Sequence, residues 1–592
     1  MQLELADWLI ILVYFAISAG IGLAYTRKAG RSLADYFVSG RALPWWLAGT
    51  SMVATTFAAD TPLAVAGLVA KYGVAGNWLW WNGAFSGILT VFFFARLWRR
   101  AGVLTDVEFA ELRYGGKPAA VLRGFRALYL ALPVNLIIMG WVTRAMVTIL
   151  QITLDINPWT GAIVLFGLTA LYSVFSGLWG VIVTDAFQFV VAMAGSIALA
   201  VLAVNAVGGL DLLQTRVAAH FGSSGAAFGV LPPTQEAWLP LSTLLVFLGV
   251  QWWAAWYPGA EPGGGGYIAQ RILSAKDERH GLLATLWFNI AHYALRPWPW
   301  ILVGFVSVIT HPGLANPEEG YVRVMVDVLP SPLKGLLLAA FAAAYMSTIS
   351  THLNWGASYL VNDLYLRFIR PGASPRAQVF ASRIATGSLM VLSLVVMAFL
   401  TSVEQGWKLL IGLGAGTGLV FILRWYWWRI NAWSEISAMA ASFVMSVALQ
   451  LAHLDSGNTS RPDYAIAMLL TVGVSTVVWL TVTLLTQPES PDTLERFYRR
   501  VRPGGAGWRN VARRLGFGND PIPGGVLSWV NWVAGVVAVY SAVFAVGALV
   551  TGSRTAAGGY FGLAIVAFAL IQRNLRADPQ LAANVDTAPA AP

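Results

Sequence analysis

The sequence has 592 residues, of which 57% are hydrophobic and only 11% are charged, whereas soluble domains average about 25% charged residues. The net charge of +10 raises the question of a nucleic-acid partner, but the basic residues lie in short segments between apolar runs, as they do in membrane loops. The absence of cysteine excludes disulfides and thiolate chemistry, and the six histidines lack metal-ligand spacing. We therefore expect a protein embedded in the lipid bilayer, without a nucleic-acid partner or enzymatic activity.

Apolar stretches of about 18 or more residues with few charges are typical of bilayer-spanning helices. They recur through most of this chain and predict about fifteen transmembrane helices in an all-α integral membrane protein. The first stretch follows the acidic start MQLELAD and has no convincing cleavage site, so we expect a retained helix rather than a signal peptide. The predicted spans lie approximately at 4–25, 45–69, 77–98, 127–152, 159–176, 182–207, 240–257, 281–309, 333–361, 384–402, 407–428, 434–453, 464–486, 527–551 and 557–572.

The distribution of lysine and arginine predicts the orientation, because cytoplasmic loops carry an excess of these residues. With the N-terminus outside, most of the 38 lysines and arginines fall in inner segments. An odd number of helices then leaves the C-terminus in the cytoplasm, and we expect a multi-pass protein of the plasma membrane. The arginines assigned to inner segments in this way include Arg96, Arg113, Arg126, Arg271 and Arg424.

Two connections are longer than ordinary loops. The stretch 208–239, on the predicted outer side, contains SSGAAFG and PPTQ and predicts a short external helix with turns. The stretch 487–525, on the predicted inner side, is basic, and we expect its arginines to meet anionic lipid headgroups. The final residues, DTAPAAP, are typical of a disordered tail.

Polar residues interrupt the second apolar run near its centre, where Thr55, Thr56, Asp60 and Thr61 precede Pro62. Proline removes a backbone donor and crowds the preceding turn, which frees carbonyl oxygens beside these side chains. Free carbonyls with hydroxyls at this depth suit a dehydrated alkali cation. The alternative is a simple proline kink whose threonines bond back to their own helix.

A second polar cluster lies in the run that ends near Asn354. On a helix Ser347, Ser350 and Thr351 share one face, and Thr348 and His352 overlap it. This density exceeds what the packing of two membrane helices requires, although hydrogen bonding between helices is the alternative interpretation.

Four stretches between about 35 and 380 carry separate motifs. They are DYFVSGRALPWW at 35–46, LYSVFSGLWGVIVTDAFQ at 171–188, YIAQRILSAK at 267–276 and the segment 347–365, which ends in NDLY. In sequence and in spacing they resemble the sodium/solute symporter family, which includes sodium-coupled glucose, galactose, proline and sialic acid transporters. Two departures stand out: Ser176-Gly177 replaces the family's usual Gly-Gly, and the run Pro262–Gly266 precedes Tyr267.

The resemblance implies a five-plus-five inverted-repeat core of the leucine-transporter type, with one leading and about four trailing helices. It also implies sodium-coupled symport, by alternating access, of a small polar organic solute such as a sugar, an amino acid or an organic anion. A passive channel or uniporter for small neutral solutes and a proton-coupled transporter are the alternatives. The expected parts are a leading helix and inner loop (1–43), the transport core (44–430), two additional helices (431–486), the basic cytoplasmic loop (487–525), two C-terminal helices (526–574) and the tail (575–592).

The resemblance also implies site residues, carried over position by position. The family's shared sodium site corresponds to backbone carbonyls of the broken helix and to a carbonyl and hydroxyls of the eighth core helix, here Ala54, Phe57, Ala344, Ser347 and Thr348. A second sodium site, present in some members, corresponds to Asp185, Ser347, Ser350 and Thr351. The positions that line the solute cavity correspond to Thr56, Asp60, Thr61, Trp81 and Asn82.

Three further ionisable residues lie within apolar runs. Arg144 could hold a substrate carboxylate or pair with Asp60, and from the sequence the two roles are equally compatible; we expect a polar solute that carries a carboxylate. His292 and Arg296 lie one turn apart, and we expect them to satisfy a broken backbone rather than to bind solute. The glycine-rich run 412–418 lacks the strand context of a nucleotide-binding motif and predicts a close-packing face on a membrane helix.

Overall fold

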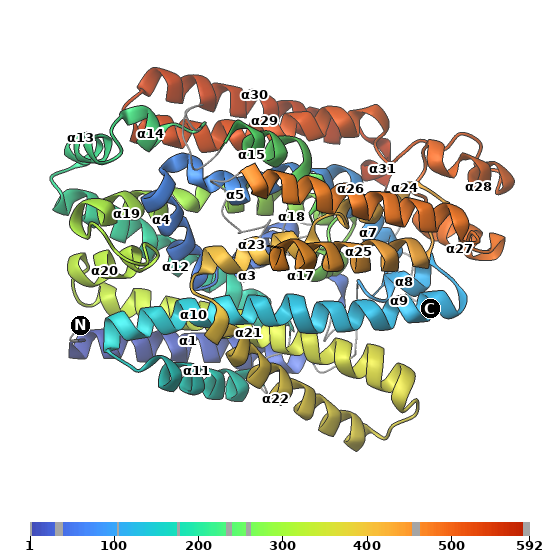
Figure 1. Cartoon of the computed structure of the whole chain (residues 1–592), viewed down its shortest axis with the longest axis horizontal. Helices are drawn as coiled ribbons and strands as arrows, with labels where there is room; N and C mark the ends of the chain where they lie inside the picture. Colours follow the sequence, from blue (N-terminus) through green and yellow to red (C-terminus); the bar gives the residue numbers. More distant parts are fainter. Residues whose placement is uncertain are drawn as a thin grey trace.

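The computed structural model of the chain describes residues 3–29, 39–103, 106–173, 178–231, 240–255, 262–452 and 462–583. Within these ranges the regular structure is helical, and β pairing is confined to two isolated bridges, Leu43 with Ala275 and Ala255 with Ala415. The long helices run side by side along one axis of the molecule (Figure 1). A bundle of this kind satisfies its backbone hydrogen bonds internally, as lipid requires. The prediction of an all-α membrane protein is confirmed.

Nine helices in the described ranges are long and apolar enough to cross a membrane, or ten when one bent pair counts as a single span. The described part of each of the fifteen predicted runs falls on a helix or on a group of consecutive helices. The runs beyond these ten are shorter or interrupted, as between α18 (Glu278–Ile290) and α19 (Pro297–Thr310), where the π-helical turn η6 (Ala291–Leu295) intervenes. The chain is a multi-pass membrane protein, and fifteen remains the predicted number of spans.

Two broken helices each begin a group of five. The first consists of α3 (Trp45–Thr55) and α4 (Asp60–Tyr72), which meet at an angle of 62°. Pro62 lies in the first turn of α4. Backbone N–H groups in the first turn have no partner within the helix, so the N–H that proline lacks costs no helical hydrogen bond. The second consists of a segment that ends in α16 (Trp252–Ala254) and of α17 (Gly266–Ser274). A repeated broken helix is the arrangement expected of an inverted-repeat core.

The other helices belong to the first half of the core, to its second half, or to the segments before and after the core. In the first half lie α5 (Trp78–Trp81), α6 (Gly83–Leu89), η3 (Thr90–Phe94), α7 (Ala95–Ala101), α9 (Gly116–Tyr129), η4 (Leu130–Val134), α10 (Asn135–Leu154), α11 (Pro158–Ser173) and α12 (Leu178–Ala206). In the second half lie α15 (Leu241–Val246), η5 (Phe247–Gln251), α21 (Leu333–Ser358), η7 (Tyr359–Ile369), α22 (Pro375–Phe399), α23 (Val403–Gly414) and α24 (Gly418–Tyr426). Before and after the core lie α1 (Leu5–Ala29), α25 (Ala432–Leu451), α26 (Pro462–Leu485), α29 (Gly525–Val550) and α30 (Arg554–Arg576).

The glycine-rich run lies at a break between α23 and α24, not on one continuous helix as predicted. Gly416 has a φ of +86°, and a Cβ there would come within 2.6 Å of the Ser475 side chain on α26. A Cβ on Gly418 would come within 2.1 Å of the Trp253 carbonyl oxygen. The expected close packing is present, but it occurs where the chain turns.

Short helices gather at the two ends of the bundle (Figure 1). One end carries α13 (Leu210–His220), α14 (Ser224–Phe228) and α20 (Glu319–Val328), and the other carries α8 (Phe109–Arg113), α27 (Pro491–Val501) and α28 (Arg509–Arg514). Segments that the arginine distribution assigns to one side of the membrane therefore lie at the same end of the bundle.

Several arginines assigned to inner loops are in fact buried. Arg126 lies 3.4 Å from the Asp106 carboxylate and 3.6 Å from that of Glu435. Arg96, on α7, pairs at 2.6 Å with Asp578, just before α31 (Pro579–Ala583). These arginines were predicted to lie in loops, whereas in the fold they join distant segments in the interior. The buried arginines that had been assigned to inner segments are Arg96, Arg113, Arg126, Arg271 and Arg424.

Candidate functional site

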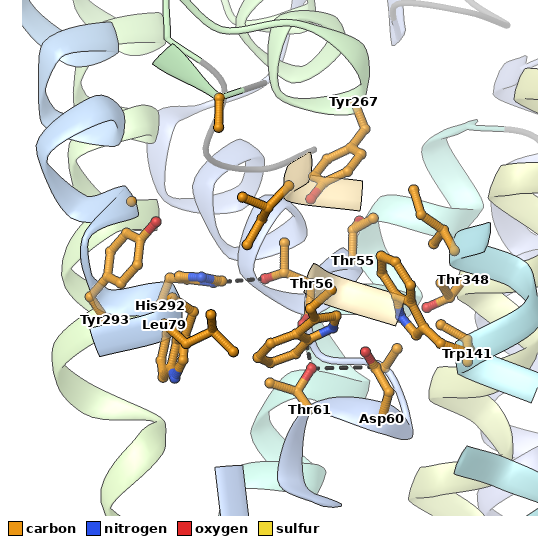
Figure 2. A pocket seen from close by; sticks show the side chains of 18 of the residues that line it. Thr55, Thr56, Asp60, Thr61, Leu79, Trp141, Tyr267, His292, Tyr293 and Thr348 are labelled. Atoms are coloured by element: carbon orange, nitrogen blue, oxygen red, sulfur yellow. Dashed lines mark hydrogen bonds between the residues drawn. The ribbon is translucent and has the colours of Figure 1, made fainter. Parts of the chain in front are cut away.

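A cavity lies where α3 and α4 break. Figure 2 shows side chains from several elements converging on it. Its hydrogen-bonding and charged groups include Thr56, Asp60, Thr61, Asn82, His292 and Arg296. Its aromatic walls include Trp80, Trp141, Trp252, Tyr267, Tyr293 and Trp407.

Four of the six residues predicted to bind solute line this cavity, namely Thr56, Asp60, Thr61 and Asn82. Trp81 is fully buried and does not line it, although its neighbours in sequence do.

Arg144 also lies outside the cavity lining, and among the described residues no ion pair joins it to Asp60. The cavity-facing residues of α10 are Ile138, Trp141 and Val142, so Arg144 lies on a different face of that helix. An Arg144–Asp60 bridge, one of the two roles left open for Arg144, is therefore not formed in this structure.

Asp60 is held by protein groups on several sides. It begins α4, and the Thr61 hydroxyl lies 3.4 Å from its Oδ1 atom (Figure 2). The Trp141 side chain donates a hydrogen bond to its carboxylate, and the charge that acts on it electrostatically is that of Arg296. A helix N-terminus favours a negative charge at this position. The cation that faces Asp60 is therefore Arg296, not Arg144.

Arg296 and His292 meet the broken helix at one hydroxyl. Arg296 Nη1 donates to Thr56 Oγ1 at 3.0 Å and to the Val53 carbonyl oxygen at 3.4 Å. His292 Nδ1 lies 3.1 Å from the same Thr56 oxygen (Figure 2), and its Nε2 atom lies 3.5 Å from Arg296 Nη2. Arg296 thus contacts the backbone of α3 near its break. Both residues also line the cavity, which was not predicted.

The residues of the first predicted sodium site lie on α3, at the break, and on α21. The Thr348 hydroxyl donates to the Ala344 carbonyl at 2.9 Å, and the Phe57 amide donates to the Ala54 carbonyl at 2.9 Å. A carbonyl or hydroxyl oxygen that makes one hydrogen bond retains a lone pair for a cation. Of this set, Thr348 lines the solute cavity. The predicted set thus offers only oxygen ligands, one of which borders the cavity.

The second predicted site is centred on Asp185 of α12. Ser347 of α21 donates to its Oδ1 atom at 3.0 Å, and Ser51 of α3 donates to its Oδ2 atom at 2.9 Å. Ser350 donates to the Ser347 carbonyl at 3.0 Å, while Thr351 is half-buried on the same helix. One carboxylate therefore joins three core helices.

Two residues near Asp185 were not predicted as part of a site. Ser51 precedes Thr55 by one helical turn, and that spacing alone could have indicated it. Arg271 is 1% exposed, acts electrostatically on Asp185 and donates to Thr55 Oγ1 at 3.3 Å. It could not have been recognised from the sequence, because it reads as one more positive charge beside an inner loop.

We expect Asp185→Asn to change the sodium stoichiometry without abolishing transport. If Asp185 holds a second sodium ion, sodium-dependent uptake has a Hill coefficient above one in the parent and close to one in the variant. Uptake measured against sodium concentration tests this. A Hill coefficient of one in the parent would mean that Asp185 only links α3, α12 and α21 and does not bind sodium.

The broken helices and the polar cavity between them define a secondary transporter with an inverted-repeat core. The chain matches the sodium:solute symporter family over residues 36–443 and belongs to that family. Sodium is accordingly its coupling ion and a small solute its cargo, and a passive channel is not favoured.

The relatives include the sodium/glucose cotransporter of Vibrio parahaemolyticus, 27% identical over 76% of this chain and 86% of the relative. The sodium/myo-inositol cotransporter 2 of Oryctolagus cuniculus is 25% identical over 83% of this chain and 78% of the relative. Among solved structures, a sodium-coupled sialic acid symporter aligns with 83% of this chain and 99% of its own, with a TM-score of 0.65 and 19% identity. The structural match shows a shared fold.

Proposed function

We propose that this protein carries a neutral polyhydroxylated solute, a hexose or a cyclic polyol, into the cell together with sodium. The observation that carries the proposal is the cavity itself, where aromatic faces alternate with amide, hydroxyl and carboxylate groups. Aromatic rings pack against the C–H faces of such a solute, and the polar groups match its hydroxyls.

The charges in the cavity favour a neutral solute because each already has partners in the protein. Asp60 has the N-terminus of α4, Thr61, Trp141 and the charge of Arg296. Arg296 has Thr56, the Val53 carbonyl and the face of Trp300, whose ring centre lies 5.4 Å from the guanidinium carbon. An ionic solute is not needed to compensate either group. The expectation of a carboxylated solute depended on Arg144, which lies outside the cavity lining.

Two relatives support this class of solute, since one is named for glucose and the other for myo-inositol. We place the coupling sodium between α3 and α21, at Ala54, Phe57, Ala344, Ser347 and Thr348. Because Thr348 borders both the ion and the cavity, a bound ion would fix one wall of the solute site. Sodium binding would then favour the outward-open state, and release of both cargoes would follow closure of the outer side.

The orientation in this proposal keeps the N-terminus outside and α27 and α28 in the cytoplasm. Each sodium ion that descends 100 mV supplies about 2.3 kcal/mol. One ion therefore supports roughly fiftyfold accumulation of the solute from voltage alone.

We expect sodium-driven uptake of glucose or myo-inositol by purified protein in liposomes, and Arg144→Gln is expected to leave the KM within about twofold. A potassium gradient of the same size is the control and should give no accumulation. Uptake confined to N-acetylneuraminate or another carboxylated solute, with loss of affinity in Arg144→Gln, would overturn the proposed solute class.

A further inference from the structure

Helix α29, which lies outside the ten-helix core, contacts the segment that forms one wall of the cavity. The hydroxyl of Tyr540 donates to the Trp81 carbonyl at 2.7 Å in the protein interior. The Tyr540 ring lies against Trp78 and Phe85, with ring centres 5.4 and 5.2 Å apart. Tyr540 therefore contacts this segment at Trp78, Trp81 and Phe85.

The Trp81 carbonyl needs this donor because the helix is interrupted there. Between α5 and α6 the Phe85 amide donates to Asn82, three residues back, at 3.3 Å. The Asn82 side-chain nitrogen donates to the Trp78 and Leu79 carbonyls at 2.8 and 3.0 Å. A carbonyl without a partner in a dry interior is costly, so the hydroxyl from α29 stabilises this interrupted geometry.

The same short segment supplies four residues to the cavity lining, namely Leu79, Trp80, Asn82 and Gly83. Trp80 stacks on Tyr293 with ring centres 5.6 Å apart and planes 22° apart. Because the Asn82 nitrogen is bonded to the backbone, its oxygen is the atom left to accept from a solute hydroxyl. A shift of the Trp81 carbonyl would therefore move two solute-contacting side chains together.

A second residue of α29 reinforces this contact. Trp532 Nε1 donates to the Phe85 carbonyl at 3.1 Å. Its ring lies 5.7 Å from that of Trp252, which lines the cavity from another wall. Helix α29 thus contacts two walls of the cavity, through residues about two helical turns apart.

We propose that Tyr540 is a positioning residue that sets solute affinity and selectivity from outside the transport core. It acts through the Trp81 carbonyl on Trp80 and Asn82 and does not itself touch the solute. Helix α29 lies beyond residue 443, where the match to the family ends, so this role belongs to the C-terminal part of this chain. The inference depends on the proposed function only for the choice of test solute.

The test is Tyr540→Phe, which keeps the ring contacts and removes only the hydroxyl. In sodium-driven uptake of glucose and of myo-inositol, we expect KM to rise about three- to tenfold, the size of one lost hydrogen bond. The ratio of kcat/KM between the two solutes should change, while kcat and the sodium concentration for half-maximal uptake stay within about twofold. The matched control is Tyr560→Phe on α30, where the side chain is 38% exposed, and its KM should equal that of the parent.

An unchanged KM and solute ratio in Tyr540→Phe would overturn the inference, as would a loss of kcat or yield alone. Should this variant fail to fold, Trp532→Phe takes its place, with a raised KM expected and an unchanged KM contradicting the proposal. If the parent transports neither neutral solute, the proposed solute class fails. Tyr540→Phe is then measured with the solute that the parent does carry, so the two failures remain separate.

Discussion

Asp60→Asn is expected to reduce kcat/KM for a neutral polyol by more than about hundredfold. The substitution removes an acceptor of solute hydroxyls and leaves the buried Arg296 without its opposing charge. A hydrogen bond to a charged group is worth about 1.5–3 kcal/mol, and the lost electrostatic balance of Arg296 adds to that effect. Sodium-driven uptake in liposomes measures the effect, and thermal unfolding of the purified variant separates lost binding from lost stability.

Two comparisons make the Asp60 result specific. Asp155→Asn removes a carboxylate that is exposed in a left-handed conformation, which asparagine tolerates, and its uptake should match the parent. Asp60→Asn combined with Arg296→Gln removes both charges and should recover part of the thermal stability but not the affinity for solute. Parent-like uptake by Asp60→Asn alone would remove Asp60 from the solute site.

Thr348→Ala is expected to weaken sodium affinity at least about tenfold while the protein stays folded, and Ser347→Ala to act in the same direction. Each change removes an oxygen from the proposed sodium site between α3 and α21. A hydrogen bond to a charged group is worth about 1.5–3 kcal/mol, and we take the lost ion contact to be similar. Sodium-dependent thermal stabilisation of the purified protein measures the affinity without transport.

Ser358→Ala is the control for the sodium prediction. Ser358 lies on the same helix, and its hydroxyl donates to the Trp355 carbonyl within that helix at 2.9 Å, as Thr348 does to Ala344. Its sodium titration should match the parent, because it lies almost three turns beyond the proposed site. Parent-like titrations for both Thr348→Ala and Ser347→Ala would show that sodium binds elsewhere.

Much of the fold could be predicted from the sequence because lipid imposes simple rules. Apolar length identified the helices, and Asp60 and Pro62 together indicated that the second one is broken. The break between α23 and α24 was missed. There, helix ends are stabilised by contacts with distant segments, such as the Gly416 amide that donates to the Ala254 carbonyl at 3.0 Å. Such contacts leave no local pattern in the sequence.

The site was predictable where it depends on one helix and not where helices meet. Thr56, Asp60 and Thr61 lie on the cavity as expected, since a break exposes its own side chains. Arg144 and Arg296 could not be told apart in this way, because in the sequence both are single charges in apolar runs. Which of them lies on the side of Asp60 depends on how α10 and the α18–α19 region are rotated about their own axes. That rotation is fixed by packing against the rest of the bundle.

The ion pair between Arg96 and Asp578 also orders events during synthesis of the protein. The two residues are 482 positions apart in the chain, and both are buried in the finished structure. At about 5–20 residues per second, roughly half a minute to a minute and a half separates the arginine from its partner on the ribosome. A buried guanidinium without a partner is costly. The start of α7, where Arg96 lies, is therefore expected to reach its final packing only after α30 has been translated. Completion of the N-terminal half thus waits for the last helices to emerge.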